Sequence, residues 1–234
     1  MELGYRVFNS GDISKFDLDF VQVSVWHKKM NDLGKIARIC EDLSEIDMPF
    51  VVHVLGVYLS DTRPEREKSL AILREYASLS DLGIILHDET LPNGERLHGL
   101  WRENYVRGIT ELQGICKVSL ENSHDSPNAL WFWNEFADSI TIDIGHFVSA
   151  GMDASAVIRA MTEDHLSKLE YIHVHKHNGI KPGGITDHWA LEEGCVELSA
   201  LKEVLDLKED VKVVVEVDGY EELRRSIDLV SKLR

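Results

Sequence analysis

The sequence predicts a (β/α)8 barrel, the TIM-barrel fold of the α/β class, in a single domain that spans residues 1–234. Short apolar runs rich in Val, Ile and Leu, typical of strands buried on both faces, alternate eight times with helix-like segments. The chain has no break in composition and no low-complexity linker that would divide it. A doubly wound open sheet is the alternative fold, but the sequence lacks the glycine-rich phosphate-binding turn typical of it.

The expected elements follow from the periodicity of the apolar residues. The segment 64–79 begins with Pro64 and Glu65 in its first turn, which favours a helix start. The aromatic segment 129–136 has helical spacing, so we expect it to pack on the barrel rather than form a lid or a dimer contact. Strands are expected at residues 2–8, 20–25, 49–57, 82–87, 115–121, 139–144, 170–175 and 211–217. Helices are expected at residues 31–46, 64–79, 101–113, 127–137, 153–168, 197–207 and 219–233.

The composition is that of a globular protein, with 44% hydrophobic and 28% charged residues. No apolar stretch approaches the about 20 residues that cross a bilayer, and the first residues lack a signal-peptide core. Cys40, Cys116 and Cys195 are odd in number and form no CxxC motif, which is typical of a reducing compartment. We therefore expect a cytoplasmic protein without a membrane partner, with Cys40 and Cys116 packed in the core.

The net charge of −16, from 41 acidic and 25 basic residues, bears on the class of partner. Nucleic-acid affinity comes from Lys and Arg side chains that neutralise phosphates, and this surface would on average repel a polyanion. We therefore expect a small-molecule substrate rather than nucleic acid. A homo-oligomer is also compatible with the sequence.

Metal-binding and proton-transferring side chains occur at the ends of six expected strands. Buried carboxylates and imidazoles are costly at such positions unless they share a function. Because the carboxyl ends of the strands meet on one face of a barrel, we expect these side chains to gather there. They lie in the runs FVVHV, LGIILHDE, KVSLENS, SITIDIGH, YIHVHKH and KVVVEV, and they are His53, His87, Glu121, Asp143, His146, His173 and Glu216.

This mixed set of oxygen and nitrogen ligands predicts a divalent metal centre. Carboxylates together with imidazoles suit Mn²⁺, Zn²⁺, Co²⁺ or Fe²⁺ better than Ca²⁺, and the lack of cysteine argues against structural zinc. Gly145 would let the chain turn so that Asp143 and His146 both face inward, while His175 follows His173 at same-face spacing. Singly, a strand-end glutamate is more often a surface residue and a lone histidine a packing residue. The joint pattern favours the metal centre.

The same residues resemble the xylose isomerase-like TIM barrels, the superfamily of sugar isomerases, epimerases and endonuclease IV. The resemblance covers the chain roughly from His53 to Glu216. It is carried by LEN at 120–122, DIGH at 143–146, HVHKHNG at 173–179, DHWALEEG at 187–194 and VEV at 215–217.

In the isomerase and epimerase branch, the resemblance implies one metal ion held by Glu121, Asp143, His173 and Glu216. It further implies that the two glutamates form the proton-transferring pair and that His146 contacts substrate oxygens.

In the endonuclease IV branch, the resemblance implies three zinc ions. Thr186 stands where that family has an aspartate two residues before the last histidine, and Asp187 is adjacent to His188 instead. A chain of 234 residues also leaves little room for the loops that the endonucleases insert into DNA. The implied ligands are His53, His87, Glu121, Asp143, His146, His173, His188 and Glu216.

We therefore expect a divalent-metal-dependent isomerase or epimerase of a small sugar, polyol or hydroxy-keto acid, with one ion favoured over two or three. Glu121 and Glu216 would act as base and acid on an enediolate. The alternatives are an endonuclease IV-like multi-zinc phosphodiesterase on abasic DNA and a non-catalytic barrel that binds a metal or small molecule. Substrate contacts are expected from His146, His175, Lys176, Lys181 and Trp26.

Overall fold

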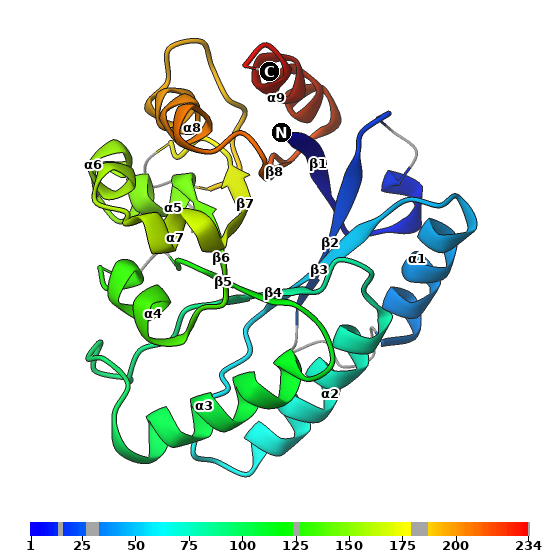
Figure 1. Ribbon diagram of the computed structural model, residues 1–234. Helices are drawn as coiled ribbons and strands as arrows, with labels where there is room; N and C mark the ends of the chain where they lie inside the picture. Colours follow the sequence, from blue (N-terminus) through cyan, green and yellow to red (C-terminus); the bar gives the residue numbers. More distant parts are fainter. Residues whose placement is uncertain (14–15, 27–32, 124–126, 179–186, 234) are drawn as a thin grey trace.

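The computed structural model describes residues 1–13, 16–26, 33–123, 127–178 and 187–233. Its eight strands form one closed parallel barrel in chain order, in which β1 pairs with both β2 and β8 (Figure 1). This confirms the predicted (β/α)8 barrel, and each observed strand overlaps its expected range. The strands are β1 Glu2–Val7, β2 Phe20–Trp26, β3 Phe50–Leu55, β4 Ile84–His87, β5 Val118–Glu121, β6 Ser139–Asp143, β7 Leu169–Val174 and β8 Lys212–Val215.

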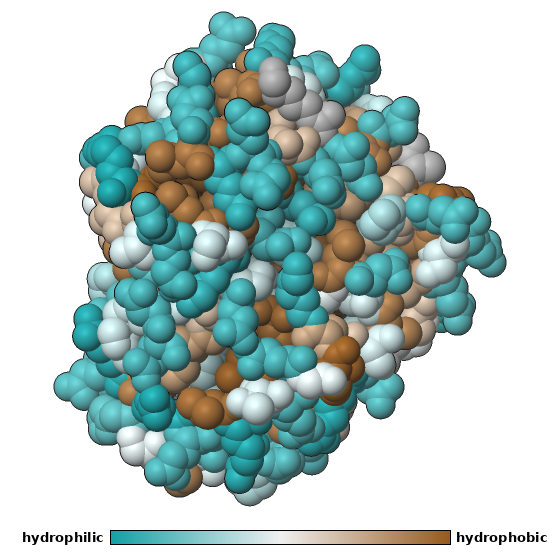
Figure 2. All heavy atoms as spheres, viewed as in Figure 1, coloured by the Kyte–Doolittle hydropathy of each residue, from teal (hydrophilic) through white to brown (hydrophobic). Residues whose placement is uncertain are grey.

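Helices surround the strands (Figure 1). In the part of the chain that the structure describes, no helix is long and apolar enough to cross a membrane. Figure 2, viewed from the same side as Figure 1, shows hydrophilic side chains over much of this face of the molecule, with apolar patches between them. The helices are α1 Leu33–Glu45, α2 Glu65–Leu79, α3 Gly99–Gln113, α4 Ala129–Phe136, α5 Ile144–Ser149, α6 Ala154–Arg159, α7 Glu163–Lys168, α8 Val196–Leu207 and α9 Tyr220–Ser231, with a 3-10 turn, η1, at Ser10–Asp12.

We expected one continuous helix at residues 153–168, and this prediction was wrong. The structure has two separate helices there, α6 and α7. α6 ends at Arg159, and a capping box at Thr162 starts α7. Thr162 Oγ1 accepts the His165 backbone N–H at 3.2 Å, while the Thr162 backbone N–H donates to His165 Nδ1 at 3.1 Å. These local bonds replace the helical hydrogen bonds that a continuous helix would need.

The capping histidine predicts a pH dependence of stability. His165 is 1% exposed, and burial lowers the pKa of its imidazole below the usual 6.5. In the unfolded chain the His165 imidazole is protonated near pH 6.5, whereas in the folded chain it is protonated only at lower pH. The neutral ring therefore contributes its full share to the free energy of unfolding above about pH 6.5, and this share is lost as pH falls below that value.

We expect the free energy of unfolding in urea to fall more steeply below about pH 6.5 in the wild type than in His165→Gln, by at most about 1.4 kcal/mol per pH unit. Glutamine at this position preserves the capping box without a titrating ring. Equal pH slopes for the two proteins would contradict the assignment.

Inward-facing side chains form layers inside the barrel. Phe20, Val51, Ile85, Tyr171 and Val214 make a buried apolar layer. Gly4 leaves room for it, because a Cβ there would lie 2.8 Å from the Phe20 ring. Successive side chains of a strand point to opposite faces, so the residue two positions further along also points inward. On β3, β4, β7 and β8 those next residues are His53, His87, His173 and Glu216, the expected site residues.

The outer core lies between strands and helices. Trp133 of α4 is fully buried and its indole Nε1 donates to the Leu120 carbonyl of β5 at 2.9 Å, which confirms the expected packing of 129–136 on the barrel. Trp131 is half-buried. Cys40 is buried in the core as predicted. Cys116 lies before β5, where it is half-buried and packs against the edge of the core.

Candidate metal centre

Three carboxylates converge on one imidazole at the carboxyl ends of β5 to β8. His173 is fully buried, and its Nδ1 lies 3.2 Å from Glu121 Oε1, 3.7 Å from Glu216 Oε1 and 3.9 Å from Asp143 Oδ2. The carboxylates come from β5, β6 and the residue after β8. The four residues that the resemblance assigns to a single ion therefore lie together.

Further histidines surround these carboxylates. Around Glu121, His53 Nε2 lies 3.0 Å from Oε2, while His146 Nδ1 and His87 Nε2 lie 3.4 Å and 3.6 Å from Oε1. All four histidines expected at strand ends, His173 included, therefore lie within 3.6 Å of a Glu121 oxygen. Two others lie beside the remaining carboxylates, His175 with Nε2 3.3 Å from Asp143 Oδ1 and His188 with Nε2 3.2 Å from Glu216 Oε2.

The LEN and DIGH motifs fit together through Asn122. Its side chain donates to the Asp143 carbonyl at 2.9 Å and accepts the Asp143 backbone N–H at 2.8 Å. Asp143 caps α5, because its Oδ1 accepts the His146 backbone N–H at 2.7 Å. Gly145 leaves the space that the His175 ring occupies, because a Cβ at position 145 would lie 2.2 Å from that ring. The short helix after β6, rather than a simple turn, thus directs His146 toward the centre.

Two site residues were missed by the sequence analysis. Gln22 of β2 is fully buried and its amide nitrogen contacts Glu216 Oε1 and His53 Nδ1. Arg6 of β1 lies 3.5 Å from Glu216 Oε2 through Nη1 and donates from Nη2 to Asp218 at 2.7 Å. Arg6 lies in the run LGYRVF and Gln22 in the run FVQVSVW, where Ser24 is also polar, and a charged or amide side chain inside such an apolar run could have identified them.

The carboxyl groups are ionised despite their burial. Burial raises the pKa of Glu121, but His173 and other imidazoles outweigh it and hold the pKa well below its ordinary value. For Glu216, burial is likewise outweighed by His173 and Arg6, and the pKa is well below normal. The pKa of Asp143 falls to about 2, because neighbouring imidazoles again exceed the effect of burial. These three carboxylates therefore remain available as anionic ligands at neutral pH.

The donor set fits a divalent cation. Buried polar atoms normally have hydrogen-bond partners. Among the described residues, both Glu121 oxygens, Asp143 Oδ2 and both ring nitrogens of His173 are buried without one. Their ligand atoms fall into compact sets, such as Asp143, His173 and Glu216, within 4.8 Å of one another. Oxygen and nitrogen ligands at this spacing match the preference of Mn²⁺, Zn²⁺, Co²⁺ or Fe²⁺.

The centre lies at the base of a pocket of about 390 Å³. His53, His87, His146, His188 and Glu216 contribute to its wall. Trp26, expected to contact substrate, lines it and is 49% exposed. Arg6, Phe8, Leu55, Asp187 and Asp218 complete the lining.

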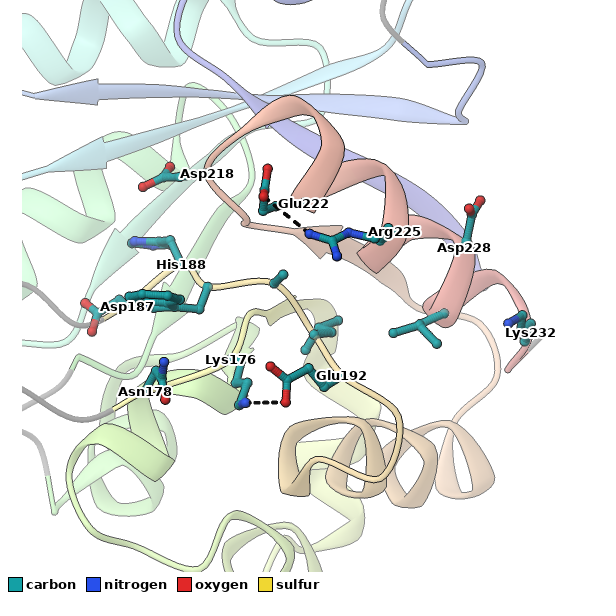
Figure 3. A pocket seen from close by; sticks show the side chains of 14 residues that line it. Lys176, Asn178, Asp187, His188, Glu192, Asp218, Glu222, Arg225, Asp228 and Lys232 are labelled. Carbon is teal, nitrogen blue, oxygen red and sulfur yellow. Dashed lines mark hydrogen bonds and ion pairs between the residues drawn. The ribbon is translucent and has the colours of Figure 1, made fainter.

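Figure 3 shows a second pocket, of about 720 Å³. Its lining shares Asp187, His188 and Asp218 with the first pocket. Lys176, expected to bind substrate, lines this second pocket, where its Nζ pairs with Glu192 at 2.7 Å. Of the other predicted residues, His175 is buried beside Asp143. Lys181 and Thr186 lie outside the described residues.

Searches with the sequence matched no protein-family model and no curated protein. Solved structures share the fold across the whole chain. A D-tagatose 3-epimerase-like protein matches at a TM-score of 0.75 and 14% identity, covering 100% of this chain and 97% of that chain. D-allulose 3-epimerase from Methylomonas sp. matches at 0.72 and 13%, with 100% and 98% covered. A xylose isomerase-like TIM barrel/4-hydroxyphenylpyruvate dioxygenase fusion protein matches at 0.72 and 12%, with 100% and 42% covered. The chain thus has the fold of the xylose isomerase-like TIM barrels.

Proposed function

We propose that this chain is a divalent-metal-dependent isomerase or epimerase of a small sugar or related polyhydroxy carbonyl compound. The observation that carries the proposal is the approach of Glu121 and Glu216, from β5 and the end of β8, to the same ring nitrogen of His173. Two carboxyl groups beside one cation site can supply the base and the acid that proton transfer next to a carbonyl requires. Structural neighbours named as 3-epimerases of D-tagatose type and of D-allulose support the same reaction class.

Glu121, Asp143, His173 and Glu216 would hold the ion. A bound divalent cation polarises a substrate carbonyl and its adjacent hydroxyl, which acidifies the neighbouring C–H bond. One of the two carboxylates would remove that proton, and the other, after taking up a proton from solvent, would deliver it to the opposite face of the enediolate. Arg6 and His188 contact Glu216, and His53 contacts Glu121, so each carboxylate is held in place by neighbours.

The pocket supports a small, uncharged substrate. Its volume of about 390 Å³ is at the small end of ligand sites. Phe8 and Trp26 offer aromatic surfaces that pack against the C–H face of a sugar ring or chain. Arg6, the only Lys or Arg side chain in its described lining, is paired with Asp218. This favours unphosphorylated ketoses over sugar phosphates.

Removal of the metal is expected to abolish turnover. Protein treated with a chelator and then dialysed should epimerise D-tagatose or D-allulose at least about 100-fold more slowly than protein reloaded with Mn²⁺, Co²⁺, Zn²⁺ or Fe²⁺. Ca²⁺ is the control ion, because imidazole ligands suit it poorly. Full turnover by protein shown to be metal-free by elemental analysis would contradict the proposal.

An endonuclease IV-like activity is the second candidate, and the extra histidines favour it. Three further sets among the described residues could each hold an ion: His53 with Glu121 and His173, His87 with Glu121 and His146, and Asp143 with His146 and His175. The net charge of −16 opposes binding of a polyanion. Two or three zinc ions per chain, together with cleavage of duplex DNA at an abasic site, would favour this candidate over the epimerase.

A further inference from the structure

We propose that the second pocket, of about 720 Å³, binds a further sugar unit, so that the substrate is a ketose carrying a neutral glycosyl group (Figure 3). A pocket of this volume is within the range of small-molecule sites. The inference rests on the proposed epimerase function for the ketose in the first pocket. Binding in the second pocket can nevertheless be measured without metal and without turnover.

The two pockets meet at residues that lie beside a proposed catalytic carboxylate. Asp187, His188 and Asp218 line both pockets. His188 Nε2 lies 3.2 Å from Glu216 Oε2, and Asp218 pairs with Arg6, which also lies beside Glu216. An occupant of the second pocket would therefore lie next to a substrate at the metal centre.

Backbone hydrogen bonds hold the boundary between the pockets in place. His188 has a φ of 60°, which is uncommon for a residue other than glycine. Its carbonyl accepts the Asp218 backbone N–H at 3.0 Å, and Trp189 exchanges backbone hydrogen bonds of 3.0 and 3.2 Å with Lys176. A sparsely populated backbone conformation persists where surrounding contacts fix it, and such conformations cluster at ligand sites. We infer that the second pocket is formed before a ligand binds, so little binding energy is lost in ordering it.

The lining of the second pocket combines an aromatic surface with paired charges. Trp189 is half-buried and offers a surface on which the C–H face of a sugar can pack. Lys176 pairs with Glu192 at 2.7 Å in the loop after β7. Arg225 pairs with Glu222 at 3.3 Å on α9 (Figure 3). Each pair is neutral as a whole, yet its remaining N–H groups and oxygen lone pairs can bond to hydroxyl groups. Such a lining suits an uncharged polyol.

The balance of charge disfavours an anionic ligand. Carboxylates outnumber Lys and Arg side chains in the described lining by five to three, so a phosphate or carboxylate group would meet net negative charge. The carboxylates are Asp187, Glu192, Asp218, Glu222 and Asp228, and the basic residues are Lys176, Arg225 and Lys232.

The glycosyl group is expected on O6 of the ketose. The metal ion and both glutamates must reach C2 and C3, which carry the carbonyl and the C–H bond to be inverted. A large substituent therefore belongs at the remote end of the sugar chain. Binding energy from a remote part of a substrate can be used to raise kcat/KM. The second pocket would thus set the specificity of the same reaction.

The first test compares isomaltulose, which carries a glucosyl unit on O6 of D-fructose, with 6-O-methyl-D-fructose. Neither sugar has the free O6 that closes a six-membered ring, so they differ mainly in the glucosyl unit. With metal-loaded wild type we expect kcat/KM to be at least about 10-fold higher for isomaltulose.

Variants of the lining assign this preference to the second pocket. Arg225→Ala, at an exposed position, should lower the preference roughly 3–10-fold, and Trp189→Ala should lower it toward one. Arg224→Ala is the matched control, because Arg224 is an exposed neighbour on α9 that does not line the pocket. Equal kcat/KM for the two sugars in the wild type, or a preference that survives both lining variants, would overturn the inference.

Calorimetry with metal-free protein separates this inference from the proposed function. We expect isomaltulose to bind at least about 10-fold more tightly than 6-O-methyl-D-fructose, and Arg225→Ala to reduce that difference. If no ketose is turned over although isomaltulose binds in this way, the proposed function fails and the second site stands. If D-allulose is turned over but isomaltulose binds no better than the methyl ether, the inference fails and the proposed function stands. Tighter binding of methyl α-D-glucosaminide than of methyl α-D-glucoside would show a cation site and contradict a neutral ligand.

Discussion

Replacing Glu216 by glutamine is expected to lower the turnover number by about 10²–10⁴-fold. The change removes the charge that accepts or returns the proton and one of the four groups that would hold the ion, while preserving the shape of the side chain. It also leaves Arg6 and His188 facing a neutral amide. The measurement is steady-state epimerisation at saturating metal, with metal affinity from calorimetry, and Glu121→Gln should behave in the same way.

Glu221→Gln is the matched control, because this exposed carboxylate lies in the first turn of α9, only five positions further along the chain. It should retain full activity and full metal affinity. If Glu121→Gln or Glu216→Gln kept wild-type turnover under these conditions, the two-glutamate mechanism would be wrong.

Replacing Trp133 by alanine is expected to reduce the free energy of unfolding by about 3–5 kcal/mol. The indole is fully buried against Phe147 and His165 and bonds to the Leu120 carbonyl. Truncation leaves a cavity beneath β5 and removes the indole hydrogen bond to the carbonyl one residue before Glu121. The measurement is urea unfolding of metal-free protein, so that metal binding does not add to stability.

Two variants separate the causes of that loss. Trp133→Phe fills most of the volume without the N–H donor, so it should lose less than Trp133→Ala, with about 0.5–1.5 kcal/mol from the lost hydrogen bond. Trp131→Ala removes a half-buried neighbour on the same helix and should cost less than either. Equal losses for Trp131→Ala and Trp133→Ala would mean that α4 does not anchor β5 as described.

Much of the fold and the candidate centre could be predicted because the relevant signals are local. Each strand is a short apolar run, and the parallel closed barrel brings their carboxyl ends to one face. Glu121, Asp143, His173 and Glu216 therefore had to be neighbours once the strands were placed. The alternation of inward and outward positions also predicts that His175 follows His173 on the same face.

The features of the candidate centre and the fold that could not be predicted depend mainly on contacts between elements distant in the sequence. Gln22 acts on Glu216 and His53, 194 and 31 positions away, and nothing near it in the chain indicates either partner. The direction of Lys176 depends on its ion pair with Glu192 across the loop after β7. The break between α6 and α7 depends on a capping box whose histidine replaces the usual glutamate or glutamine, so it does not match the common sequence signature.

The central claim, proton transfer between two glutamates at a metal centre, is tested most directly by solvent deuterium incorporation. Metal-loaded protein would be incubated in D₂O with D-tagatose or D-allulose, and the epimeric product analysed by NMR. A base and an acid on opposite faces predict one deuterium at the inverted carbon of nearly every product molecule, and none in protein stripped of metal. A product that keeps its original hydrogen at that carbon would contradict the account.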